Sequence, residues 1–385
     1  MRLPDTAPGH SPAAPRLPSH AQLSRLVARS LGLDAASLAA GLRPATLDDL
    51  PAIVAFRRAH LSKPPAWDDD AYLRWRYRLG REGQGMGDLW CLHRGTQLIA
   101  LMGTEDLQIE LDGERVSGVQ AMDLLALPET QDAGLGIWLN QALLARHPFV
   151  LAVGANQNSG GIVRRLFEPL APQRTYTHPL DIGPFVRRRW PAVSALPLAV
   201  RAGNAGLALW RFGLRRRQSR DLAVVATLPP DDALLPAPSP PGRVRLLCQG
   251  EHLRHRWQDN PRRVFELRQL HRVRTLAGSI AWTLGQDDRG QAELHVVDWH
   301  FDREDTFSAL LHTAIREAVA RRCNCVRLVI QDEATQRTAA RLGFMRSHQD
   351  EGRPCGVQSN DPELAARLAR ATWALTGASD DTDGL

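Results

Sequence analysis

Lysine, cysteine and long apolar runs are all scarce in this sequence. Lys63 is the only lysine among 48 basic residues, so arginine supplies almost all of the positive charge. Abundant arginine, alanine, glycine and proline indicate a compositional bias of the coding genome, and the net charge of +6 is spread thinly over 385 residues. This charge therefore predicts no nucleic-acid partner. No stretch reaches the ~20 apolar residues of a membrane-spanning helix.

The five cysteines form neither a C-x-x-C pair nor a cluster with nearby histidines, so a disulfide framework or a zinc site is not indicated. Cys323 and Cys325 are either a redox or metal pair or small buried thiols, and the apolar run CNCVRLVI favours buried thiols. No basic segment followed by an apolar one begins the sequence, so secretion is not expected. We expect a cytoplasmic protein in a reduced state.

The length exceeds what one hydrophobic core normally organises. An apolar fraction of 43% and a charged fraction of 23% are typical of globular proteins. We expect a disordered tail (1–19), an N-terminal α/β domain (20–183), a basic and apolar linker with a proline-rich stretch (184–242), a C-terminal α/β domain (243–350), and a C-terminal helix with an acidic tail (351–385).

The two expected domains share an order of elements and two short sequence matches. Each has β-prone runs separated by turns, then an amphipathic helix, a buried strand and another helix. The segment LRWRY at 73–77 recurs as LRHRW at 253–257, and Asp123 in AMDLL is matched by Asp298 in VVDWH. The preserved order predicts an internal duplication.

The most informative motif is LALPETQDAGLGIWLNQAL, in which a strand leads through a glycine-bearing loop directly into a helix. The free backbone N–H groups and the positive dipole end of a helix N-terminus attract phosphate. Gly134 and Gly136 would let the backbone approach a pyrophosphate without a Cβ in the way. The alternative is that these residues form only a tight turn between a strand and a helix and bind no ligand.

This motif resembles the coenzyme A loop of the GCN5-related N-acetyltransferase superfamily, which reads Gln or Arg, two variable residues, Gly, one variable residue, then Gly or Ala. Gln131, Gly134 and Gly136 fill that pattern. The resemblance implies two tandem domains of mixed-sheet, three-layer α/β/α architecture, with acetyl-CoA or another acyl-CoA as cofactor. It implies that the loop Gln131, Asp132, Ala133, Gly134, Leu135 and Gly136 holds the pyrophosphate, while Leu125, Ala126 and Leu127 pair with the pantetheine arm and Asn156 follows the next strand.

The second domain lacks glycines at the corresponding place, where DREDTFSALL puts Ala309 and Leu311. It does retain the Gly-Phe pair that the superfamily places after the next helix, as Gly343 and Phe344, whereas the first domain has Phe167 and Glu168 there. We therefore expect cofactor binding in the first domain alone.

Amine acylation needs a group that takes a proton from the ammonium and a donor near the leaving thiolate. Asp123 is the candidate base, because a carboxylate inside an apolar strand is costly unless it is used or paired. Pairing with Arg74 or Arg76 is its equally plausible structural role. The superfamily's usual tyrosine donor is missing, and Tyr176 is a substitute only if its strand returns to the cleft.

Two arginine-rich regions have alternative interpretations. The LRWRY and LRHRW segments either bind an anionic substrate or pack as aromatic and arginine faces beneath each sheet. The segment 185–217 combines basic clusters with apolar residues and tryptophans. It either contacts an anionic membrane surface or forms an interdomain helix with a solvated rim.

The leading functional hypothesis is acyl-CoA-dependent N-acyl transfer to an amine of a small molecule or amino-sugar precursor. The second hypothesis is an aminoacyl-tRNA-dependent peptidyltransferase, because such enzymes also have duplicated acetyltransferase folds. Those proteins generally lack an intact coenzyme A loop. A non-catalytic acyl-CoA-binding or scaffold protein is the third hypothesis. We expect a cytoplasmic location, with peripheral contact to the inner membrane through 185–217 as an open alternative.

Overall fold

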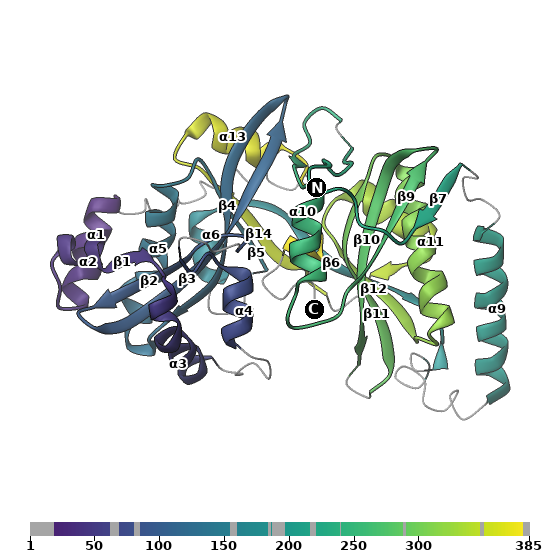
Figure 1. Cartoon of the computed structure of the whole chain (residues 1–385), viewed down its shortest axis with the longest axis horizontal. Coiled ribbons are helices and arrows are strands. Elements are labelled where there is room, and N and C mark those ends of the chain that lie inside the picture. Colours follow the sequence, from purple (N-terminus) through teal and green to yellow (C-terminus); the bar gives the residue numbers. More distant parts are fainter. Residues whose placement is uncertain are drawn as a thin grey trace, which may run out of the picture.

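The computed structural model describes residues 19–61, 69–80, 85–154, 160–183, 186, 197–215, 221–238, 240–287, 290–346 and 350–379. Strands form one continuous mixed sheet with helices packed on both faces (Figure 1). The prediction of a mixed α/β fold is confirmed. Among the described residues, no helix is both long enough and apolar enough to cross a membrane.

The first half of the chain contains helices α1 (His20–Ser30), α2 (Ala35–Gly41), α3 (Leu50–His60), α4 (Asp69–Arg76), α5 (Leu135–Leu144) and α6 (Gly160–Leu166). Its strands are β1 (Leu42–Pro44), β2 (Leu89–Arg94), β3 (Gln97–Leu111), β4 (Glu114–Ala126), β5 (Val150–Val153) and β6 (Glu168–Pro179).

The second half contains helices α9 (Pro197–Arg215), α10 (Gly250–Leu253), α11 (Glu304–Ala320), α12 (Glu333–Arg341) and α13 (Pro362–Arg370). Its strands are β7 (Leu222–Val225), β8 (Arg245–Leu246), β9 (Glu266–Arg272), β10 (Thr275–Gln286), β11 (Ala292–Phe301), β12 (Cys325–Ile330), β13 (Met345–Arg346) and β14 (Arg353–Gln358).

The two halves exchange a strand. Along the sheet the order is β1-β2-β3-β4-β5-β14-β6-β12-β11-β10-β9-β7, so β14 from the end of the chain lies beside β5. Strand β6 pairs with β14 from Glu168 to Gln173, and with β12 from Arg174 to Pro179. The ranges expected from the sequence therefore divide the sheet differently, since β14 falls in the expected tail at 351–385. Strand pairing is non-local, and no sequence pattern in either strand reports its partner.

Local sequence explains the main elements of the first half. The β3–β4 hairpin turns at Asp112 and Gly113, which have φ values of 53° and 83°. Asp-Gly is the residue pair that such two-residue turns favour. Helix α3 begins with Pro51 in its first turn and buries Ile53 and Phe56 on the face toward β3 and β4.

Each half contains a pair of parallel strands that separate toward their carboxyl ends. Strand β4 pairs with β5 only from Val119 to Ala121 but continues to Ala126. Strand β11 pairs with β12 only from Glu293 to Val296 but continues to Phe301. Each separation leaves one edge of the longer strand without a paired neighbour strand, and these two openings position the candidate sites.

Candidate functional site

The predicted glycine-bearing loop connects β4 to α5. After Ala126 the chain forms a single 3₁₀ segment from Pro128 to Ala133, and then Gly134 adopts φ 76° and ψ 14°. This left-handed conformation is favourable for glycine and disfavoured for other residues. Helix α5 begins immediately at Leu135, so the loop ends at a helix N-terminus as the sequence predicted.

The N-terminus of α5 carries no capping side chain and no acidic residue in its first turn. Its first backbone N–H groups are therefore available to an anion. Gly136 has a packing role as well, because a Cβ there would lie 2.6 Å from Ile162 Cδ1 of α6. A side chain at this position would therefore require Ile162 to shift.

Helix α1 lies against this loop, which the sequence did not reveal. A Cβ on Gly134 would be 3.7 Å from Leu23 Cδ1, and Trp138 of α5 donates from Nε1 to Ser24 Oγ at 2.9 Å. The Trp138 ring also stacks on His20. Helix α1 therefore forms part of the wall beside the α5 N-terminus. The capping pair Ser19 and Gln22 is the only sequence signal for the start of this helix.

Asp123 occupies a bulge in β4. Leu101 pairs with Leu125 and Gly103 with Met122, so two residues of β4 face one residue of β3 at this point. Asp123 itself has φ 50°, a left-handed conformation that is uncommon for a residue with a side chain. The bulge turns its carboxylate toward the face of the sheet covered by α3 and α4, while the adjacent Leu124 lies near α5.

The Asp123 carboxylate is paired. Tyr77 donates its hydroxyl to Asp123 Oδ2, and Arg57 Nη1 of α3 lies 3.6 Å from Oδ1. Burial alone would raise the pKa of Asp123, but the charge of Arg57 and the hydrogen bond from Tyr77 hold it below its ordinary value. Burial and the Asp123 charge raise the pKa of Tyr77 well above its ordinary value, so Tyr77 remains a donor. Arg57 and Tyr77 complete this site, and the second belongs to the repeated LRWRY segment.

The arginines of the repeated segments already bind a carboxylate. Arg76 Nη2 lies 2.8 Å from Glu105 Oε2, and Arg256 Nη1 binds Glu105 Oε1. All three side chains are almost fully buried. Arg74 is on the surface with Asp70. The contacts therefore favour the packing interpretation of these segments. Asp123 has the arginine partner of its structural role, and that partner is Arg57 of α3.

The structure separates Tyr176 from the loop. It lies in the part of β6 that pairs with β12 and β13, opposite Leu328 and Arg346. Its side chain belongs to the core of the second half, whereas Leu127 and Leu135 of the loop region belong to the core of the first. Burial raises the pKa of Tyr176. Its predicted role as a proton donor is not favoured by this placement, because β6 crosses into the other half of the sheet.

Some predicted residues fall outside the structural description. Leu125 and Ala126 pair with Leu101 and Ala100 of β3, which leaves their other edge toward the opening beside β5. Asn156 lies outside the described residues, as do the side chains of Gln131 and Asp132. Their predicted contacts with a cofactor remain predictions.

The start of α11 in the second half is occupied by its own carboxylates. Its first turn contains Glu304 and Asp305. Asp305 Oδ1 accepts from the backbone N–H of Thr306 at 2.9 Å, and Glu304 Oε1 accepts from Thr338 at 2.6 Å. A phosphate at this helix N-terminus would meet negative charge, whereas the first turn of α5 has no acidic residue.

The opening between β11 and β12 is bridged by the C-terminal segment Thr372–Ser379. Thr376 donates from Oγ1 to Asp298 Oδ1 at 2.9 Å, and the backbone N–H of Leu375 donates to Gln331 Oε1 at 3.1 Å. Asp298 is on β11 and Gln331 directly follows β12. Between described residues, no hydrogen bond bridges the corresponding opening at the ends of β4 and β5. Among the described residues, the two halves therefore differ in whether hydrogen bonds bridge this opening.

Cys323 and Cys325 are buried and unbonded to each other. Burial, with the nearby Glu293 carboxylate, raises the pKa of Cys325 to about 12. Within the described ranges no group of three His, Cys, Asp or Glu side chains is arranged to hold a metal ion. These contacts favour the interpretation of the pair as buried thiols.

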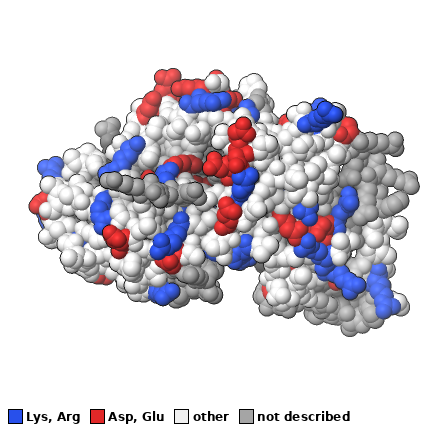
Figure 2. All heavy atoms as spheres, in the orientation of Figure 1, with Lys and Arg blue, Asp and Glu red and all other residues white. Residues whose placement is uncertain are grey.

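Charged side chains on the face shown in Figure 2 are interspersed in sign. Arg78 binds Asp106 at 2.6 Å and Asp88 at 3.1 Å. Arg272 lies 3.0 Å from Asp305. Nearby carboxylates thus neutralise the charge of these arginines.

Comparison with known proteins supports the fold. A GCN5-related N-acetyltransferase from Anabaena variabilis aligns with a TM-score of 0.54 and 12% identity, over 82% of this chain and 71% of that one. A GCN5-related N-acetyltransferase from Kribbella flavida gives 0.49 and 16% identity over 86% and 73% of the chains. Saccharomyces cerevisiae N-myristoyltransferase with bound myristoyl-CoA gives 0.46 and 10% over 82% and 78%.

The fold assignment rests on the first of these alignments. No protein-family model matches the chain, and no curated protein matches its sequence. The chain therefore has an acetyltransferase-type fold, and its chemistry has to be inferred from its own residues.

Proposed function

We propose that the chain is an acyl-CoA-dependent N-acyltransferase that binds one acyl-CoA, in its first half. The observation that carries this proposal is the difference between the two openings. In the first half, an uncapped helix N-terminus stands beside the unpaired edge of β4. In the second half, the equivalent places hold the carboxylates of α11 and the bridging segment Thr372–Ser379.

The pyrophosphate would lie against the backbone of Gln131 to Gly136. The free N–H groups and the dipole of α5 support this position, as does the absence of a Cβ on Gly134. The pantetheine arm would pair with the free edge of Leu125 to Leu127, and Asn156 is the predicted contact beyond β5. Acetyl-CoA is the expected cofactor, and a longer acyl-CoA would use the same contacts.

The bulge in β4 suits the thioester. Two β4 residues opposite one β3 residue leave a backbone N–H outside the ladder, where it can polarise the thioester carbonyl. Asp123 was the predicted base, but Arg57 and Tyr77 lower its basicity. Its surroundings support a role in fixing the bulge. Protonation of the leaving thiolate by solvent requires no tyrosine, and this fits the position of Tyr176 in the other half.

A non-catalytic acyl-CoA-binding protein is the strongest alternative, since both functions need the same loop. A peptidyltransferase that uses aminoacyl-tRNA is less well supported, because it has no need for the open helix N-terminus. Turnover of acyl-CoA with an amine separates the first two, and acyl-CoA affinity separates both from the third. The acceptor we propose is the amine of a small molecule, an amino sugar among the candidates, and the site of action we propose is the cytoplasm.

Calorimetric titration with acetyl-CoA tests the proposal. We expect a stoichiometry of one per chain in the parent and no measurable binding in Gly134→Asp, which adds a carboxylate and a strained Cβ at the α5 N-terminus. Gly95→Asp is the matched control, since Gly95 has φ 61° in the β2–β3 turn with open space around it. Parent-like affinity in a folded Gly134→Asp protein would remove the loop from cofactor binding.

We also propose that α9 contacts an anionic lipid surface. This helix stands apart at the right-hand edge of Figure 1. Asn204 fastens it through hydrogen bonds with Ile182 and Asp181. Leu198 and Leu209 on its outer face are 75% and 73% exposed. No acidic residue occurs between Asp181 and Asp221, while nine arginines do, and this composition suits anionic headgroups.

Vesicle co-sedimentation tests this contact. The parent should sediment with vesicles that contain phosphatidylglycerol and remain in solution with pure phosphatidylcholine. Leu198→Asp with Leu209→Asp should abolish sedimentation. Val264→Asp is the control, because Val264 is also a strongly exposed apolar residue, at 85%, but it belongs to a segment far from α9 in the sequence. Unchanged sedimentation of the double variant would exclude α9 as the contact.

A further inference from the structure

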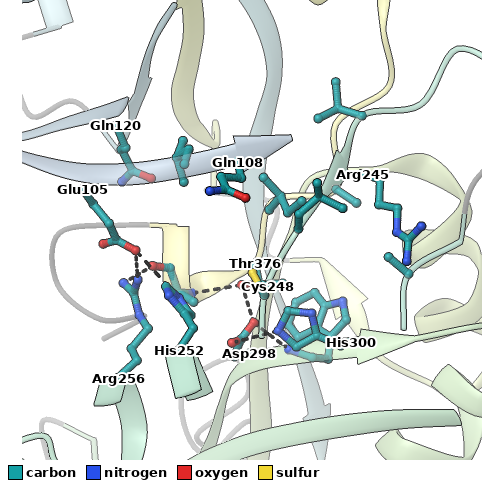
Figure 3. Close-up of a pocket in the computed structure, with 18 of the residues that line it drawn as sticks. Glu105, Gln108, Gln120, Arg245, Cys248, His252, Arg256, Asp298, His300 and Thr376 are labelled. Atoms are coloured by element: carbon teal, nitrogen blue, oxygen red, sulfur yellow. Dashed lines mark hydrogen bonds and ion pairs between the residues drawn. The ribbon is translucent and has the colours of Figure 1, made fainter. Parts of the chain in front are cut away.

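A cavity of about 110 Å³ lies between the two halves (Figure 3). Its first wall is β3 and β4, with Glu105, Gln108 and Gln120. Its second wall is the end of β11, with Asp298 and His300, while His252 of α10 and Thr376 of the C-terminal segment close its sides. Among the described residues, those of the predicted acyl-CoA loop and of α9 do not line it.

The cavity lies on the same face of β4 as a residue that borders the bulge. Gln120 pairs with Glu105, and Met122 pairs with Gly103, so all four residues share one face. Tyr77 contacts that same face at Gly103 and donates to Asp123. Gln120 in the cavity wall is therefore three residues from Asp123 in the bulge, and the buried side chains of Met122 and Tyr77 lie on the face between them.

One wall of the cavity carries an imidazole held by a fixed carboxylate. His300 Nε2 lies 3.4 Å from Asp298 Oδ2. Asp298 cannot turn away, because Trp257 donates to Oδ2 at 3.1 Å and Thr376 to Oδ1 at 2.9 Å. Nε2 is buried on the side of the ring that faces Asp298, which leaves Nδ1 as the ring atom that can accept a proton from a ligand.

A second imidazole faces the same space. His252 Nε2 lies 3.9 Å from Glu105 Oε1. Burial lowers the pKa of His252 to about 4, so this ring is neutral near pH 7 and can accept a hydrogen bond from a ligand. Glu105 is neutralised by Arg76 and Arg256 and adds no free negative charge.

The charges around the cavity favour a hydroxyl-rich amine over a phosphorylated ligand. Besides Arg256, which binds Glu105, two arginines line the cavity, and each has a carboxylate nearby. Arg243 lies 3.7 Å from Asp332, and Arg245 lies 3.8 Å from Glu110. The remaining polar side chains include the amides of Gln108 and Gln120, the Thr376 hydroxyl, the imidazoles and two carboxylates, Asp106 and Asp298. Asp106 is paired with Arg78, and Asp298 accepts from Trp257 and Thr376. Such a set matches several hydroxyl groups and one amine.

We propose that this cavity binds the acceptor of the N-acyl transfer, a compact primary amine with several hydroxyl groups, and that His300 is its proton acceptor. This inference rests on the proposed function. The ammonium gives one proton to His300 Nδ1, and the neutral nitrogen attacks the thioester carbon. The C–S bond breaks, coenzyme A leaves as a thiolate, and the second amine proton passes through solvent to the thiolate. The products are an amide, free coenzyme A and one released proton.

Glucosamine is the probe, with glucose as the amine-free comparison. Binding is measured by saturation-transfer NMR, acetyl-CoA affinity by calorimetry, and turnover by thiol release. His300→Gln should bind acetyl-CoA and glucosamine like the parent but lose ~100- to 10,000-fold in turnover. His295→Gln is the matched control, because His295 is on the same strand 3.4 Å from Glu293 and does not line the cavity. It should keep parent turnover.

The outcomes separate the two proposals. A protein that does not bind acetyl-CoA refutes the proposed function. A protein that binds acetyl-CoA but not glucosamine, or turnover in His300→Gln equal to the parent, overturns the acceptor site. Equal loss in His300→Gln and His295→Gln also overturns it. If His300→Gln does not fold, Gln108→Trp at the exposed rim should remove glucosamine binding and leave acetyl-CoA affinity unchanged, and retained glucosamine binding would count against the cavity.

Discussion

Trp75 and His255 hydrogen-bond to each other's backbone across the interface between the two halves. Trp75 Nε1 donates to the carbonyl oxygen of His255 at 2.7 Å, and His255 Nε2 lies 2.8 Å from the carbonyl oxygen of Trp75. Their rings also stack at 5.7 Å. These residues occupy the same position in LRWRY and LRHRW. Such reciprocal contacts are typical of an interface about a two-fold axis.

Arg76 and Arg256, which directly follow Trp75 and His255, both contact the Glu105 carboxylate. These contacts predict the effect of Glu105→Gln. Removing the charge takes from the buried Arg76 and Arg256 the carboxylate that both contact, which should lower the free energy of unfolding by about 3–5 kcal/mol. Urea denaturation measures the loss. Asp70→Asn, which breaks the exposed pair with Arg74, should cost less than about 1 kcal/mol. A loss of similar size in both variants would contradict the central role of Glu105.

The sequence shows the repeated segments of this interface, but it does not predict that they meet each other. The repeated segments and their matched aspartates were recognisable as patterns, and in each half the aromatic residue donates to the aspartate: Tyr77 to Asp123, and Trp257 to Asp298. The pairing of Arg57 with Asp123 joins α3 to a bulge in β4. Bulges and ion pairs depend on the packing of elements that are distant in the chain. The residues next to Arg57 and Asp123 in the sequence therefore do not reveal this contact.

The strand exchange and the filled second opening were also beyond prediction from sequence. The glycine loop could be predicted, because a turn and a helix start are local events. Strand β14 and the segment Thr372–Ser379 are placed by partners far away in the chain, such as Val153 and Asp298. The absence of glycines in the second half predicts that this half binds no cofactor, and the structure places Glu304, Asp305 and the segment Thr372–Ser379 at the corresponding positions.

Asp123→Asn separates the two roles that the sequence left open. Since Arg57 and Tyr77 hold the pKa of Asp123 low, we expect the variant to lose stability, by about 1–3 kcal/mol, and to retain turnover when folded. Thermal unfolding and thiol release measure the two effects. Tyr77→Phe, which keeps the charge but removes the hydrogen bond, should destabilise as well. A stable Asn variant that binds acetyl-CoA but turns over ~100-fold more slowly would restore Asp123 as the base.

His252 should make stability depend on pH. Its pKa of about 4 in the folded protein is below the ordinary 6.5. As the pH falls from about 6.5 to about 4, the unfolded chain binds a proton that the folded chain does not, so the free energy of unfolding decreases. Because part of the ring is exposed, we expect a contribution of about 1–2 kcal/mol over this window. It should vanish in His252→Gln, as denaturation curves across the window would show. An NMR titration midpoint near 6.5 for His252 would contradict the prediction.

Removal of the residues from Thr372 onward should weaken the protein without creating a second cofactor site. Trp373 and Leu375 are 3% and 1% exposed, and burial of such side chains contributes about 1.5–3 kcal/mol each, so a loss of about 3–6 kcal/mol is expected in urea denaturation. Removal of only 380–385 is the control and should leave the stability unchanged, because the segment that bridges β11 and β12 is retained. In the longer truncation, provided it folds, Glu304 and Asp305 still occupy the start of α11 and would repel a pyrophosphate. Calorimetry with acetyl-CoA should therefore still give one site per chain. A value near two would show that the C-terminal segment alone closes the second opening and that the α11 carboxylates are no barrier to the cofactor.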